Sequence, residues 1–191
     1  MSERESRIPA GEKGTADRVE ADEGAYWVRL VTRQALDREG KAMSNCVGDG
    51  EYDAAVGNET LTDDDAIWSL RCCDGVSIAT VEVSVLSETE ALLVQARGYR
   101  NRLVGRGAAE AVRHLVAAYA AAGLRLRMGA TSGLVIAPSG RTYRTDRVPE
   151  PVWEEIYAAS EAEAEATLEP APAATPFEVP RTLRIEASFS S

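Results

Sequence analysis

The stretch AIWSLRCCDGVSIATVEVSVLSETEALLVQAR, residues 66–97, decides the fold class of this chain. It contains three runs rich in β-branched and aliphatic residues: Ala66 to Cys72, Ile78 to Leu86 and Ala91 to Arg97. Such runs favour β-strands, and the links between them are short and polar. Short links join antiparallel neighbours, so the stretch predicts an antiparallel β-meander.

Polar residues recur along these three runs with the period of two that a strand imposes. In the third run, the alternation groups Leu93 with Gln95 and Arg97. We expect one face of the meander to carry Ser69, Arg71, Thr80, Glu82, Gln95 and Arg97. A slip of one residue would invert a strand, and an ordinary solvated sheet face is the alternative. Beside an arginine, a buried Glu82 would form an ion pair, whereas without a partner its pKa would rise.

Helical spacing flanks the meander on both sides. Trp27, Leu30, Val31 and Leu36 predict a helix from residue 24 to Gly40, and residues 102–122 predict a second helix that ends at Gly123. Residues 43–58 predict a turn that leads into a short helix, with Ser44 or Asn45 as N-cap. Further strands are expected at residues 124–128, 134–137 and 141–144, and a third long helix opens at Pro151.

These elements predict an α+β domain over residues 24–167, in which helices cover a short antiparallel sheet. Residues 1–23 are acidic and almost without apolar side chains, so we expect them to be disordered. Residues 168–191 hold four prolines, which indicate a linker. After it, apolar and polar residues alternate over 183–189, which predicts a terminal strand able to pair with a sheet edge.

Composition limits the classes of function. The net charge is -10, but residues 97–147 carry ten arginines and two acids, which suits a phosphate-contacting surface. The alternative is that this basic segment packs against its own acidic flanks. Three cysteines form no disulfide framework, which predicts a cytoplasmic protein. No run approaches the ~20 apolar residues that span a bilayer, so no membrane partner is expected.

No metal or cofactor is expected either. There is one histidine and no C-x-x-C pair, whereas structural zinc sites take four Cys or His ligands.

Cys46 is the candidate nucleophile. A thiol at a helix N-terminus has its thiolate stabilised by the helix dipole, and Asn45 and Gly48 would let backbone amides approach an anion. Glu82 would serve as acid/base, with Gln95 and Asn101 positioning the substrate. The alternative is that Cys46 is a small apolar plug. His114 lies in a helical stretch and is assigned a structural role.

The chain resembles the PcfJ-like family, which is encoded mainly on conjugative plasmids, phages and related mobile elements. The resemblance is carried, over residues 39–101, by Glu39-Gly40, Met43, Asn45-Cys46-Val47-Gly48, Tyr52, Ile67, Leu70-Arg71, Thr80-Val81-Glu82-Val83, Gln95, Arg97-Gly98 and Asn101. The chain departs from the family pattern in two places: Asp49-Gly50-Glu51 lengthens the spacing between Gly48 and Tyr52, and the acidic loop 57–65 looks inserted. The family has no settled biochemical activity, so the resemblance implies a genomic context rather than a reaction.

Two functions stay open. The first is an accessory protein of a mobile genetic element, which binds a protein or single-stranded nucleic acid through Asn45, Arg71, Arg97, Arg100 and Arg102. The second is a Cys-dependent hydrolase or transferase that uses Cys46, Glu82, Gln95 and Asn101.

Overall fold

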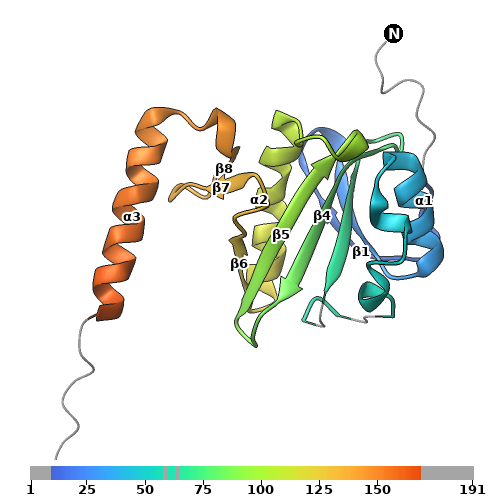
Figure 1. Ribbon diagram of the computed structural model, residues 1–191, viewed down its shortest axis with the longest axis horizontal. Coiled ribbons are helices and arrows are strands. Elements are labelled where there is room, and N and C mark those ends of the chain that lie inside the picture. The colour runs from blue at the N-terminus through green and yellow to red at the C-terminus, as the bar shows by residue number, and fades with distance from the viewer. Residues whose placement is uncertain (1–9, 58–59, 63–64, 169–191) are drawn as a thin grey trace, which may run out of the picture.

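A six-stranded sheet forms the centre of the fold in this computed structural model, which describes residues 10–57, 60–62 and 65–168 (Figure 1). Its strands run in chain order from one edge to the other: β1 Thr15–Glu20, β2 Tyr26–Leu30, β3 Ala66–Arg71, β4 Ser77–Val85, β5 Glu90–Gly98 and β6 Arg125–Met128. All neighbours are antiparallel except β5 and β6, which are parallel. The α+β class and the meander over β3, β4 and β5 are therefore confirmed.

Two helices pack on opposite faces of this sheet. Helix α1, Arg33–Met43, lies on the face that carries Val28 and Ile67. Helix α2, Arg106–Ala121, connects β5 to the parallel β6 and covers the other face, where Trp68 is fully buried. The indole Nε1 of Trp68 donates to Tyr119 Oη of α2 at 3.1 Å, so the buried ring leaves no polar atom unsatisfied.

A small hairpin and a third helix follow the sheet. The hairpin consists of β7, Leu134–Ile136, and β8, Thr142–Arg144. Helix α3, Glu150–Leu168, stands apart from the sheet in Figure 1. An ion pair of 2.7 Å between Arg125 Nη1 of β6 and Glu163 Oε1 joins α3 to the body.

The N-terminal prediction is wrong in its second half, because β1 pairs with β2 along the sheet edge. The Asp17 carboxylate receives the buried Arg29 guanidinium at 2.6 Å, and main-chain hydrogen bonds to β2 add to this contact. A polar strand can be ordered in this way because the backbone bonds of a sheet do not depend on side-chain hydropathy.

The helix expected over residues 24–40 is also wrong in its first part. Residues 26–30 form β2, where all five residues are buried. Because β2 is buried on both faces, apolar residues lie at successive positions, and a helical spacing such as that of Trp27 and Leu30 arises within the run by chance. Helix α1 begins only after Thr32, whose hydroxyl accepts a hydrogen bond from the Ala35 amide.

Two irregularities reset the side-chain alternation of the sheet. Ala79 faces Leu70 while Ser77 faces Arg71, so Ile78 is an extra residue in β4. In β5 the register shifts between the partners of Glu82 and Val83, which makes Val94 an extra residue. Leu93 consequently joins the α2 face and not, as the plain alternation predicts, the face of Gln95. Such bulges occur preferentially beside functional sites.

The expected segments at the C-terminus, the linker and the strand over residues 183–189, lie outside the described residues. Among the residues that are described, no helix combines the length and the apolar character needed to cross a membrane.

Candidate functional site

The polar residues predicted for one sheet face do share a face. Ser69, Thr80 and Arg97 lie directly opposite one another on β3, β4 and β5. Glu82 lies opposite Gln95 in the next row. This face is the one on which α1 packs. Ser69 and Thr80 are buried there, whereas Arg97, Glu82 and Gln95 are half-buried.

Two glycines bring the turn that carries Cys46 down onto this face. A Cβ on Gly40 of α1 would lie 2.6 Å from the Gly48 amide nitrogen, and one on Gly48 would lie 3.2 Å from Asp37 Cα. The helix and the turn therefore touch backbone to backbone. The Asn45 side chain caps the turn by accepting from the Val47 amide at 3.2 Å, as expected of an N-cap.

The four residues predicted to be catalytic line one hollow. We use the name polar hollow for the space lined by the apolar residues Val47, Ile67 and Val81 and by the polar residues Asn45, Cys46, Tyr52, Thr80, Glu82, Gln95, Arg97 and Asn101. Its volume is about 20 Å³, which is room for about one water molecule. In this conformation the polar hollow can hold a single small polar group, such as the edge of a larger ligand.

Gln95 organises the polar side chains of the hollow. Its amide Nε2 donates to Tyr52 Oη at 2.6 Å and to Glu82 Oε2 at 2.7 Å. Both amide hydrogens are therefore engaged, and they hold the phenol and the carboxylate in place. A Tyr oxygen that accepts from Gln95 keeps its own hydrogen for donation to a ligand.

Tyr52 remains a phenol at neutral pH. Burial raises its pKa to about 12, and the nearby Glu82 and Cys46 act in the same direction. The hollow thus offers a permanent hydroxyl donor next to the carboxylate of Glu82, a combination that can recognise a group bearing both an acceptor and a donor.

A strained turn places Asn101 at the edge of the polar hollow. The 3-10 turn η4, Tyr99–Asn101, has left-handed backbone at two successive positions, Arg100 and Asn101, each with φ of 56°. Left-handed conformation costs a non-glycine residue about 1–2 kcal/mol. Strain of this kind concentrates at functional sites, where the surrounding structure maintains it.

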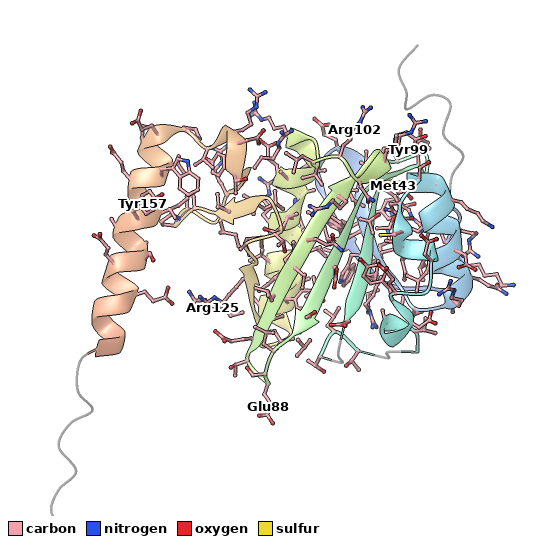
Figure 2. All side chains as sticks on the ribbon, in the orientation of Figure 1. Met43, Glu88, Tyr99, Arg102, Arg125 and Tyr157 are labelled. Atoms are coloured by element: carbon pink, nitrogen blue, oxygen red, sulfur yellow. The ribbon has the colours of Figure 1, made fainter. Side chains whose placement is uncertain are left out.

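Arginines predicted to bind a ligand fall into two groups. Arg71 is 1% exposed and donates to the Gly11 carbonyl at 2.6 Å, so it supports the fold and does not reach a ligand. Arg97 borders the hollow and donates to the Thr131 carbonyl, while Arg100 and Arg102 are exposed. In Figure 2, Tyr99 and Arg102 lie at the end of the sheet near Met43, opposite the end marked by Glu88.

The helix N-terminus that was expected to activate Cys46 differs in the structure. The helix after Asn45 is a single 3-10 turn, η2 Cys46–Gly48, too short for a macrodipole that would stabilise a thiolate. His114 lies on α2, on the other side of the sheet, 3.4 Å from Asp22. A Cys46–His114 dyad, the alternative to the structural role assigned to His114, is thereby excluded.

Sequence reasoning missed the role of Glu39 as the buried centre of this face. Its carboxylate is 0% exposed and accepts from Ser77 Oγ at 2.8 Å and Thr80 Oγ1 at 3.0 Å. Burial raises the pKa of Glu39, although hydrogen bonds from Ser77, Ser69 and Thr80 and the charge of Arg71 oppose this rise. The signal was its helical spacing from Leu36 and Met43, both fully buried on α1.

The described residues contain no group of three or more His, Cys, Asp or Glu side chains that could hold a metal ion. No family model, no curated protein and no solved structure matches this chain. The resemblance to the PcfJ-like family therefore stays a prediction from the residues quoted for it.

Proposed function

We propose that this protein is an accessory protein of a mobile genetic element that binds single-stranded nucleic acid. The mobile-element context comes from the PcfJ-like resemblance. The binding function is supported by the arginines that gather where the polar hollow meets the end of β5.

The segment from residue 97 to residue 106 carries four arginines and no acid, in a chain whose net charge is -10. Arg97 borders the polar hollow, and Arg100 and Arg102 follow on an exposed turn. Because phosphate contacts supply most of the affinity for nucleic acid, this local positive charge is the observation that carries the proposal.

The hollow beside these arginines suits a base edge. The Tyr52 hydroxyl donates, the Glu82 carboxylate accepts, and the amide of Asn101 can do both. Base edges combine donors and acceptors, and unpaired bases expose them on a single strand. A duplex would keep its base edges away from so narrow a hollow.

Salt-dependent retention of an octathymidylate tests the proposal. We expect the parent protein to bind at low salt and the variant Arg97→Gln/Arg100→Gln/Arg102→Gln to bind more weakly. Loss of three phosphate contacts would reduce the slope of log K against log salt by about 2. Arg127→Gln, a change at an exposed arginine of β6, is the matched control and should leave retention unchanged. Absence of binding by the parent protein at low salt would end this proposal.

A second candidate is a Cys-dependent hydrolase or transferase, favoured by the convergence of Cys46, Glu82, Gln95 and Asn101 on one hollow. Cys46 Sγ would attack an electrophilic carbon while its proton passes to Glu82. The bond from that carbon to the leaving group would break as Glu82 returns the proton to the leaving group, and water or an acceptor substrate would then displace Cys46 from the covalent intermediate.

Alkylation by iodoacetamide across pH tests this candidate. Mass spectrometry separates the peptide of Cys46 from that of the exposed Cys73, which serves as internal reference. A nucleophile should react at pH values well below those needed by Cys73. Equal profiles for the two thiols, with midpoints near ~8.5, would refute the candidate.

A further inference from the structure

A second pocket, distinct from the polar hollow, lies between α2 and the β8 hairpin. Its volume is about 580 Å³, within the ~300–1,000 Å³ range of small-molecule sites. Four arginines line it, namely Arg106, Arg141, Arg144 and Arg147, together with Thr142 and Tyr143. We call it the arginine pocket.

The walls of the arginine pocket are held by hydrogen bonds to the backbone. Thr142 Oγ1 donates to the Ala109 carbonyl of α2, and Arg144 Nη1 donates to the Val104 carbonyl at 3.2 Å. These contacts tie β8 to α2 and to the segment before it. The pocket is therefore a built feature of the fold and not a gap between loosely placed elements.

Positive charge in the pocket exceeds the negative charge around it. Glu110 pairs with Arg106 at 2.9 Å, and Asp146 receives Arg144 through two bonds of 2.6 and 2.8 Å. Arg147 lies 4.0 Å from the same Asp146, at the limit of an ion pair. Glu110 in the lining and Asp146 beside it thus oppose four lining arginines, which leaves a net positive site on a protein of net charge -10.

Arg141 is exposed at the pocket and, within the described part of the chain, its side chain makes no ion pair or hydrogen bond. A guanidinium presents donors in a planar fork that matches two phosphate oxygens. Arg141 and Arg147 are therefore the side chains best able to take an anionic group.

Helix α2 adds a further contribution because it starts at the pocket. Arg106 is its first residue, and Gly105 at the N-cap position offers no side-chain cap. The first amides of a helix lack intrahelical partners and carry partial positive charge, which favours a phosphate.

We propose that the arginine pocket binds a nucleotide, with its phosphate on Arg141 and Arg147 and its base against Tyr143. We place the base against the Tyr143 ring because bases stack on aromatic side chains in sequence-tolerant sites. This inference goes beyond the proposed function, since none of these residues belongs to the polar hollow. The nucleotide can be free or part of a single strand, and the two sources share this chemistry.

Calorimetric titration with adenosine 5′-monophosphate, 5′-phosphorylated octathymidylate and inorganic phosphate tests the inference. We expect Arg141→Gln/Arg147→Gln to weaken nucleotide binding at least 10-fold, and Tyr143→Leu to weaken it several-fold. Both arginines are exposed, so the double variant should fold normally, which circular dichroism checks. Arg127→Gln is the control and should bind as the parent protein does.

Loss of affinity for the monophosphate in the double variant supports a site for free nucleotides, and loss for the octamer alone supports a site for a strand end. If the double variant weakens neither probe, the inference is wrong. Inorganic phosphate that binds as tightly as the monophosphate would overturn the part assigned to Tyr143. The variant of Arg97, Arg100 and Arg102 should retain monophosphate binding, so failure here and failure of the proposed function can be told apart.

Discussion

Replacing Glu39 by glutamine should change how the stability of the protein depends on pH. Glu39 is buried at the centre of the α1 face, where its oxygens accept from Ser77 and Thr80. Burial raises its pKa in the folded state above the unfolded value of about 4.3. A carboxyl with a raised folded pKa contributes stability that is present below the unfolded pKa and is lost as the pH rises through the folded pKa.

The magnitude follows from proton linkage. Between the unfolded and the folded pKa, one additional proton is bound by the folded state, so stability falls by up to about 1.4 kcal/mol per pH unit. Glutamine resembles the protonated carboxyl in shape and cannot ionise. The difference between the unfolding free energies of wild type and Glu39→Gln should therefore decrease with pH in this window and become constant above it.

Urea unfolding at pH 5, 6, 7 and 8 measures this difference, with fluorescence of the fully buried Trp27 and Trp68 as the signal. All other titrating groups are common to the two proteins, so their contributions cancel in the subtraction. A difference that is flat from pH 5 to pH 8 would refute the reasoning. It would mean that Glu39 titrates alike in the folded and unfolded states despite its burial.

Two further predictions concern the contacts that shape the polar hollow. Gly40→Ala should lower the unfolding free energy by about 1–3 kcal/mol because its Cβ would meet the Gly48 backbone at 2.6 Å. The control Gly107→Ala on α2, whose Cβ meets nothing within 4 Å, should raise the unfolding free energy by about 0.5–1 kcal/mol. Urea unfolding compares the two variants, and a neutral or stabilising Gly40→Ala would contradict the close contact. Tyr52→Phe should remove a phenol with a pKa of about 12, visible as a smaller absorbance change at 295 nm near that pH, and should lower the unfolding free energy by about 1 kcal/mol through loss of the hydrogen bond from Gln95. The protonated phenol stabilises the fold below a pH of about 10, and this effect disappears as the pH rises to about 12. An unchanged titration would show that Tyr52 is not buried against Glu82.

The local pattern of apolar and polar residues was sufficient to predict a helix or strand where one face of the element was buried and the other was not. Strands β4 and β5 and the helix over residues 106–121 show such a pattern, and the structure has them with bounds close to those expected. Strand β3 is buried on both faces and was predicted from its β-prone composition and its short link to β4. Pattern failed for β2, since residues 26–30 are buried on both faces and show no alternation. It failed for β1 because a polar edge strand is ordered by main-chain pairing, which side-chain hydropathy does not report.

The residues of the polar hollow were also predictable only in part. Alternation placed Thr80, Glu82, Gln95 and Arg97 on one face, and pairing of β4 with β5 brought them together as expected. Alternation could not foresee the extra residue Val94, since a bulge arises from contacts between strands and not from the residue itself.

By itself, the sequence determined the α+β class, the antiparallel meander and the polar face on which the hollow lies, because period and turn spacing are local properties of the chain. Only the tertiary structure decided that Glu39 is buried beneath this face, that Arg71 serves the fold and that His114 lies across the sheet from Cys46. Those outcomes depend on which face of α1 and α2 meets the sheet and, for Arg71, on where the segment before β1 lies. The reason is that burial and charge pairing are set by neighbours far away in sequence, which become neighbours only when the helices pack.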